Sequence, residues 1–268
     1  MQVAPLLISV TLYLSSFIVL LAAIKKKSPT PNTFKYCLGL ATLSHAVVLQ
    51  LSLFSGSQLN LSLLNAANMI FFAISVISWF AIMRKMPIEN LLIALFPLTT
   101  VTLILSGLIA ENELKTIQGE GLISHILLSI LAYSFITIAA LQACLLAIQE
   151  KQLRQHNFNG LFQYFPPLQT MEDLLFEMIW LGFITLTAAI ATGALFLHDI
   201  FAQHLVHKTI LSIIAWGVFA ILILGRHLQG WRGTTATKLT LAGFTALMLA
   251  YFGSKFVLEV LLQKSWQV

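Results

Sequence analysis

Residues 3–24 read VAPLLISVTLYLSSFIVLLAAI and are followed directly by Lys25, Lys26 and Lys27. A helix needs about 20 predominantly apolar residues to cross the hydrocarbon core of a bilayer, and this stretch supplies them without a charged residue. No Lys or Arg precedes the stretch, which reverses the charge order of a cleavable signal peptide. We therefore predict a retained first span whose N-terminus lies outside the cytoplasm.

Apolar runs of this kind recur along the whole chain. Hydrophobic residues make up 58% of the 268 residues and charged residues 9%, which is far from the composition of a water-soluble domain. The runs between polar breaks predict spans at residues 3–24, 36–54, 61–83, 88–110, 122–148, 178–197, 210–225 and 239–262. The predicted fold class is therefore all-α, a polytopic transmembrane helical bundle of about eight spans. It forms a single integral membrane domain, residues 1–268, surrounded by the lipid bilayer.

Lysine and arginine are distributed unevenly between the two sides of this bundle. With the N-terminus outside, the cytoplasmic side collects Lys25, Lys26, Lys27, Lys35, Arg84, Lys85, Lys151, Arg154, Arg226, Arg232 and Lys238. The outer side receives Lys115, Lys208, Lys255 and Lys264. Because cationic loops are retained in the cytoplasm, this asymmetry predicts a multi-pass protein of the bacterial inner membrane with both termini outside (periplasmic). It also explains the net charge of +5 without a nucleic-acid partner.

The longest polar break, residues 149–177, is predicted to be the main cytoplasmic loop. Thr170, followed by Glu172 and Asp173, is typical of a helix N-cap with an acidic first turn, so a short helix is expected to lead into the sixth span. No other loop is large enough to form a domain. Any chemistry is therefore expected within the bundle or at its rims.

Histidine is the informative residue type for function. The sequence has no G-x-S-x-G, Walker, H-E-x-x-H or C-x-x-C motif, so we predict no enzyme and no catalytic residue. Neutral imidazole, however, ligates haem iron. His45 lies near the middle of the second span, where a structural hydrogen bond and a cofactor role are both open. His125 opens the fifth span with Ser129 and Tyr133 on the same face, which fits an interfacial histidine or an axial ligand facing the outer compartment.

Three further histidines gather in the outer loop between the sixth and seventh spans. His198, His204 and His207 are read either as solvated loop residues or as ligands, and their spacing matches no zinc template. We therefore predict no metal site other than haem iron. His227 follows Arg226 at the inner end of the seventh span, where it is either a positive-side anchor or a ligand.

Several short segments, in a shared order, resemble a known family. They are NLSLLN at residues 60–65, LAYS at 131–134, FPPLQTMEDLL at 165–175, TGALF at 192–196, GWRG at 230–233 and AYFG at 250–253. The chain resembles the cytochrome c assembly membrane protein family, whose CcsA- and CcmC-like members handle haem, and most of all its small CorE-like branch. The resemblance covers nearly the whole chain.

For the haem handlers, the resemblance implies an outer tryptophan-rich loop that cradles haem between outer histidines. His125 matches the first of these histidines by its place ahead of LAYS, and His227 lies near the family's transmembrane histidine. The expected loop reads HDIFAQHLVHKT at residues 198–209, without tryptophan, and the last residues, QKSWQV, lack the second outer histidine. His204 or His207 could replace that ligand, since both are predicted on the same side as His125.

Two functions follow from the resemblance. The first is haem binding and presentation in cytochrome complex assembly, with haem as the cofactor and other membrane proteins of cytochrome assembly as partners. The alternative, suggested by the name of the CorE-like branch, is an accessory role in divalent cation homeostasis, for magnesium or cobalt, without haem and beside a cation transporter. Hard cations prefer oxygen ligands, and the predicted membrane interior offers few carboxylates.

Overall fold

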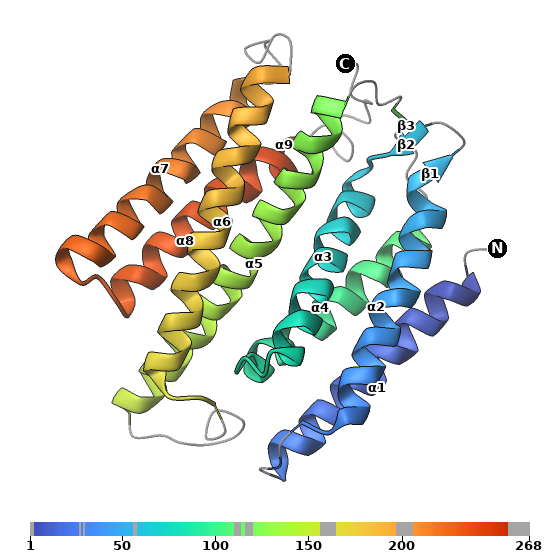
Figure 1. Cartoon of the computed structure of the whole chain (residues 1–268), viewed down its shortest axis with the longest axis horizontal. Coiled ribbons are helices and arrows are strands. Elements are labelled where there is room, and N and C mark those ends of the chain that lie inside the picture. Colours follow the sequence, from blue (N-terminus) through green and yellow to red (C-terminus); the bar gives the residue numbers. More distant parts are fainter. Residues whose placement is uncertain are drawn as a thin grey trace. The chain divides into compact units, whose positions relative to one another are not determined.

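The computed structural model describes residues 3–26, 28, 30–55, 58–109, 114–115, 120–155, 165–196 and 206–256 (Figure 1). The chain divides into two compact units. Unit 1 comprises Met1–Thr116 and Asn157–Pro167, and unit 2 comprises Ile117–His156 and Leu168–Val268. Whether the two units act as the single membrane domain predicted for residues 1–268 stays a prediction.

Unit 1 contains four long helices. They are α1 Val3–Lys25, α2 Asn32–Leu53, α3 Leu63–Met83 and α4 Glu89–Leu108. Helix α1 contacts α2 and α4, and α3 contacts the same two helices, so the four form a closed ring. Tyr13, Phe34 and Phe96 fill its interior, with Phe96 packing against both of the other rings.

A short antiparallel sheet lies in unit 1 between α2 and α3. It consists of β1 Phe54–Ser55, β2 Gln58–Asn60 and β3 Leu114–Lys115, with Leu59 paired to Phe54 on one side and to Lys115 on the other. The NLSLLN segment continues from this sheet into α3. The Ser62 hydroxyl accepts a hydrogen bond from the Asn65 N–H at 3.4 Å and caps the helix. The sheet was not predicted, because its strands are too short to show a pattern.

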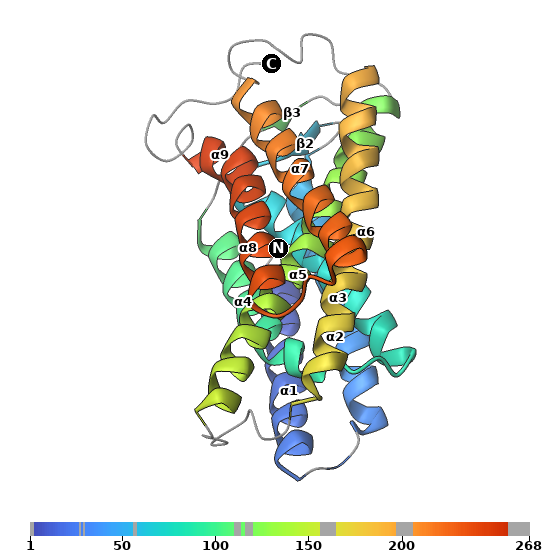
Figure 2. The ribbon, with the colours of Figure 1, turned by 90° about the vertical axis from the view of Figure 1, so that its left-hand side faces the viewer.

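Unit 2 repeats the ring arrangement with different helices. Its elements are α5 Glu120–Arg154, α6 Leu168–Phe196, α7 Val206–Gln229, α8 Thr234–Met248, the π-helix η2 Leu249–Gly253 and α9 Ser254–Phe256. Helix α5 contacts α6 and α8, and α7 contacts the same two helices. Figure 2 shows α7 and α8 side by side, joined by a tight turn.

Small residues let α5 and α6 pack closely over most of their length. Ala139 and Ala143 of α5 are fully buried, and a Cβ added to Gly182 of α6 would lie 2.7 Å from the Ile136 side chain. Close backbone approach through small residues is the usual way in which membrane helices gain packing contacts, because lipid supplies no hydrophobic force between them. The two helices therefore form the most closely packed pair of unit 2.

The surface has the polarity expected of a protein in lipid. Large apolar side chains such as Leu43, Ile18 and Leu195 are exposed, whereas Ser16, Asn68 and Gln142 are fully buried. Among the described residues, eight helical segments are long and apolar enough to cross a membrane. The last of them, Thr234–Phe256, joins α8, η2 and α9. The prediction of an all-α bundle with about eight spans is confirmed, and the side on which the termini lie stays a prediction.

The predicted loop at residues 149–177 is narrower in the structure. Helix α5 continues to Arg154 and α6 begins at Leu168, so Thr170 lies inside α6 rather than at its N-cap. Polar residues extend α5 beyond its apolar part because a helix satisfies its own backbone hydrogen bonds in any solvent. The Arg154 guanidinium also pairs with Glu150, one turn earlier, at 2.6 Å.

Candidate functional site

His125 is held in one orientation by the backbone of the neighbouring helix. It lies in the second turn of α5, half-buried, with its Nδ1 2.8 Å from the carbonyl oxygen of Ala189 in α6. A carbonyl oxygen accepts hydrogen bonds and never donates, so Nδ1 carries the proton. In the neutral ring this leaves the lone pair on Nε2, which is the tautomer and support typical of a metal-ligating histidine.

The polar stripe predicted on the His125 face of α5 includes Tyr133, which connects α5 to α8. The Tyr133 hydroxyl donates a hydrogen bond of 2.7 Å to the Leu247 carbonyl of α8. Its ring lies 6.0 Å from the ring of Tyr251 and 6.1 Å from that of Phe252, both in η2. The AYFG segment thus lies in the π-helical turn and departs there from ordinary helix geometry. Such turns are rare and frequently occur at functional sites.

The three histidines of the predicted outer loop are only partly within the description. His207 lies in the first turn of α7 and is exposed, whereas His198 and His204 lie outside the described residues. Helix α7 begins at the same end of unit 2 as α5, because α5 and α6 are antiparallel neighbours and α7 follows the end of α6. We call this the His125 end of unit 2.

His227 lies at the other end of α7, twenty positions after His207. It is exposed, and its ring is 5.9 Å from the ring of Trp180. At about 1.5 Å per residue, a separation of about 30 Å along the helix keeps His227 away from His207. The structure therefore does not bring His227 to the His125 end.

His45 lies in unit 1 and is enclosed by other side chains. It is 0% exposed, its Nδ1 is 3.2 Å from the Tyr13 hydroxyl, and its ring meets the edge of Phe72 at 5.6 Å. Of the two roles left open by the sequence, the hydrogen bond to a neighbouring helix is the one observed. No described residue hydrogen-bonds its Nε2.

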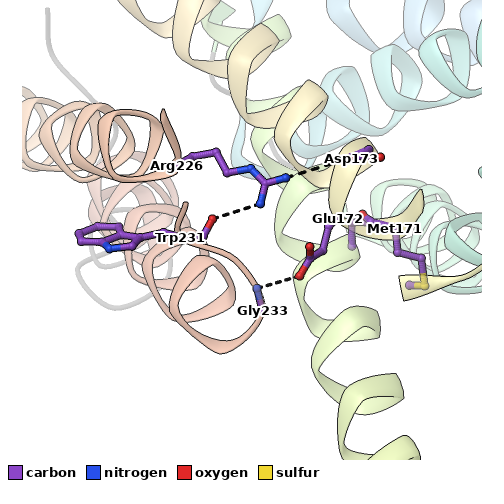
Figure 3. A network of polar contacts seen from close by, with 7 residues as sticks. Met171, Glu172, Asp173, Arg226, Trp231 and Gly233 are labelled. Carbon is purple, nitrogen blue, oxygen red and sulfur yellow. Dashed lines mark hydrogen bonds and ion pairs between the residues drawn. The ribbon is translucent and has the colours of Figure 1, made fainter. Parts of the chain in front are cut away.

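The opposite end of unit 2, which we call the Arg226 end, is built from two segments singled out in the sequence. Figure 3 shows the GWRG turn facing the start of α6. The Arg226 guanidinium donates to the Trp231 carbonyl at 3.3 Å, lies 3.9 Å from the Asp173 carboxylate and covers the Phe176 ring at 4.5 Å. The Glu172 carboxylate accepts the Gly233 N–H at 2.8 Å.

Glycine is required at two positions of this turn and at one position of the helix before it. Gly230 and Gly233 have φ values of +67° and +55°, in the region that side chains rarely adopt. The chain folds back at Trp231, whose backbone N–H donates to the Gly225 carbonyl at 3.2 Å. The Trp231 indole then lies against Gly225, where a Cβ would clash with it. The GWRG segment is thus a helix-ending turn with its tryptophan packed on the helix that it leaves.

A pocket of about 300 Å³ lies beside this turn, and charges of both signs line it. Its lining includes Glu150, Arg154, Glu172 and Arg232. Glu150 is paired with Arg154, and Glu172 with the Gly233 N–H. Both carboxylates are therefore already engaged within unit 2. We interpret the residues that line the pocket as the anchor of the α7–α8 turn.

Replacing Glu172 by alanine is expected to loosen the α7–α8 turn. The change removes the acceptor for the Gly233 N–H, and a lost hydrogen bond to a charged group in a partly buried place costs about 1.5–3 kcal/mol. The measurement is thermal unfolding of the purified protein in detergent. The matched control is Asp173→Ala, whose carboxylate is 59% exposed and 3.9 Å from its partner, so its loss is expected to change stability by less than about 1 kcal/mol. Equal effects of the two changes would contradict this role of Glu172.

Metal ligands other than a haem-type axial histidine are not assembled in the described part of the chain. No group of three or more His, Cys, Asp or Glu side chains there could hold a metal ion. Haem iron needs one or two axial ligands, since the porphyrin supplies the others. His125 alone could supply one such axial ligand, and both the haem role and the divalent-cation role stay predictions.

Eight helices long and apolar enough to cross a membrane, found among the described residues, define a multi-spanning membrane protein. The family model described as Cytochrome C assembly protein matches residues 33–262. This chain belongs to that family, and it is a multi-pass protein of the inner membrane. The family resemblance predicted from the short segments is confirmed.

Individual relatives support the same assignment. The chain is 31% identical over 227 residues to the inner membrane protein YpjD of Escherichia coli K12. The aligned region covers 83% of this chain and 85% of that protein. It is 26% identical over 174 residues to the cytochrome c biogenesis protein CcsA of Guillardia theta, covering 59% and 58% of the two chains. With CcsA of Gloeobacter violaceus it shares 28% identity over 100 residues, which cover 37% and 30%.

Proposed function

We propose that this protein binds haem at the His125 end of unit 2 and presents it for cytochrome complex assembly. The observation that carries the proposal is the hydrogen bond from His125 Nδ1 to the Ala189 carbonyl. It fixes the ring, leaves Nε2 as the electron-pair donor and costs no further ordering when iron arrives. The relatives named for cytochrome c biogenesis supply the context.

A second axial ligand would come from the start of α7 or the residues before it. His207 is exposed in the first turn of α7, so its side chain can turn without disturbing the packing of unit 2. His204 lies outside the described residues and is the alternative. Bound haem would supply a redox-active iron, and the protein would act by coordination and presentation rather than by turnover.

The His125 end is proposed to face the outer compartment, with both termini on that side. Support comes from the cations at the Arg226 end. Arg226 lies in the last turn of α7, Arg232 in the turn that follows, and Lys151 and Arg154 at the end of α5. Loops rich in lysine and arginine stay in the cytoplasm. A haem bound at His125 would then be available to partners outside the inner membrane.

Labelling of single cysteines is expected to reveal this orientation. With Cys37 and Cys144 replaced by serine, Val206→Cys at the start of α7 should react in intact cells with a maleimide that cannot cross the membrane. Lys151→Cys near the end of α5 should react after the membrane is opened. Labelling of Lys151→Cys in intact cells, with Val206→Cys protected, would reverse the proposed orientation.

The proposal is tested by the absorption spectrum of the protein purified in mild detergent from haem-replete cells, oxidised and then reduced. We expect a Soret band that shifts on reduction, together with sharpened visible bands if two histidines ligate the iron. A protein that stays colourless after haem is added would overturn the proposal. The divalent-cation role would then be tested by the sensitivity of a deletion strain to cobalt and to magnesium limitation.

A further inference from the structure

The Ala189 carbonyl that orients His125 has a second side-chain donor. The Thr192 hydroxyl of α6 lies 3.0 Å from the Ala189 oxygen and 2.9 Å from the carbonyl oxygen of Ala188. His125 Nδ1 lies 2.8 Å from the same Ala189 oxygen. One backbone atom of α6 is therefore the meeting point of a side chain from α5 and a side chain from its own helix.

The Ala189 oxygen cannot serve all of these donors fully. A carbonyl oxygen has two lone pairs, and α-helix geometry already directs the N–H of Gly193, four positions later, toward it. The Thr192 O–H and the His125 Nδ1–H therefore share what remains. The Thr192 proton has an alternative acceptor in the Ala188 oxygen. The strength of the His125 hydrogen bond thus depends on how far the Thr192 proton is drawn to Ala189.

This sharing affects the other nitrogen of the imidazole ring. A histidine that donates its Nδ1–H to a strong acceptor becomes a more basic electron-pair donor at Nε2. A competing donor on the same acceptor weakens that hydrogen bond, so Nε2 becomes less basic. Hydrogen bonding around the axial ligand is one of the means by which a protein sets the reduction potential of haem iron, and a more basic ligand favours the ferric state.

We infer that Thr192 is a positioning residue for His125, whose hydroxyl weakens the hydrogen bond to Ala189 and so lowers the electron-donating strength of Nε2. With haem at this site, Thr192 biases the iron toward the ferrous state. This consequence for iron rests on the proposed function, whereas the effect on the imidazole does not. Because the Ala189 acceptor belongs to the main chain, Thr192 is the side chain through which the hydrogen bond can be altered without touching the ligand.

The first measurement needs no haem. Purified protein with isotope-labelled histidine is studied in detergent by NMR, and the His125 signals are identified by their loss in His125→Ala. Thr192→Val keeps the shape of the side chain and removes the competing donor. The His125 Nδ1 proton should therefore move downfield, because its hydrogen bond becomes stronger. Thr192→Ser restores a hydroxyl and should resemble wild type.

Thr185→Val is the matched control on the same helix. The Thr185 hydroxyl bonds to the Leu181 and Gly182 carbonyls at 2.8 and 3.1 Å. This is the bonding pattern of Thr192, about two turns earlier in α6, whereas the His125 ring bonds to the Ala189 carbonyl. Thr185→Val should therefore leave the His125 signal where it is in wild type.

The second measurement is a redox titration of the haem-loaded protein. Thr192→Val should raise the ratio of ferric to ferrous haem affinity by about two- to tenfold, the effect expected of one neutral hydrogen bond. The midpoint potential should fall accordingly, by roughly 20–60 mV for a one-electron couple. Thr192→Ser and Thr185→Val should keep the wild-type midpoint.

The outcomes separate this inference from the proposed function. If the His125 Nδ1 proton stays in place or moves upfield in Thr192→Val, the inference is overturned, whatever the haem content. A downfield shift with an unchanged midpoint potential would overturn the link from the imidazole to the iron. A downfield shift in a protein that binds no haem would overturn the proposed function and leave Thr192 in control of the His125 hydrogen bond.

Discussion

His125→Ala is expected to abolish the Soret band of the purified protein at haem concentrations that saturate wild type. The change removes the imidazole whose Nε2 lone pair would ligate iron. Disturbing only the hydrogen bonds that support a metal ligand costs roughly 10–100-fold in affinity, and loss of the ligand itself should exceed this. The measurement is a haem titration followed by absorption, in the ferric and ferrous states.

Two other histidine variants complete the test of His125→Ala, one as a control and one as a probe of the second ligand. His227→Ala lies at the Arg226 end and should leave haem affinity unchanged. His207→Ala should convert a spectrum of two-histidine ligation into one of single ligation if His207 is the second ligand, and should have no effect if His204 is. A Soret band that survives His125→Ala at full strength, but disappears in His227→Ala, would move the site to the other end of unit 2.

Gly225→Ala is expected to destabilise the protein by about 1–3 kcal/mol, the range found for added methyl groups in packed interiors. A Cβ at this position would lie 2.2 Å from the Trp231 indole. The indole cannot move freely, because its backbone is fixed by the hydrogen bonds of the GWRG turn. Thermal unfolding in detergent, monitored by tryptophan fluorescence, should show both a lower midpoint and a changed emission of the folded state.

The same helix offers a matched control at Gly217. A Cβ there would meet no atom within 4 Å, and replacing glycine by alanine inside a helix is otherwise favourable by about 0.5–1 kcal/mol. Gly217→Ala should therefore be neutral or stabilising. If Gly225→Ala were equally well tolerated, the packing of Trp231 on α7 would not be what holds the turn.

The spans could be predicted because the solvent imposes them. An apolar run such as residues 3–24 must form a helix in lipid, because only a helix satisfies all its backbone hydrogen bonds within one segment. The observed helix is Val3–Lys25. The ends of the helices were less predictable. Helix α5 continues to Arg154 because its polar last turns contain no helix-breaking residue. A prediction from hydropathy instead ends the span at the last apolar residues. The division into two four-helix rings left no repeat in the sequence, since ring closure depends on which helices touch and not on similar residues.

The site was predictable in its parts but not in its assembly. His125, Ser129 and Tyr133 could be placed on one helical face from spacing alone. The partner of His125 could not, because a main-chain carbonyl such as that of Ala189 has no signature in sequence. The π-helical turn Leu249–Gly253 could not be predicted either, because nothing in the AYFG segment distinguishes it from an ordinary helical stretch. The family segments marked these regions without indicating which atoms meet.

The backbone acceptor beneath His125 has a consequence for genetics. Every amino acid at position 189 supplies the same carbonyl oxygen, so substitutions there that preserve α6 leave the imidazole aimed as before. Ala189 is 3% exposed, so a saturation mutagenesis screen should reject large side chains at position 189 because of packing, and accept small ones such as glycine or serine. At position 125 it should reject every side chain that lacks the imidazole. The tolerance at position 189 thus reports the space between α5 and α6, and the hydrogen bond itself leaves no mark on the choice of side chain there.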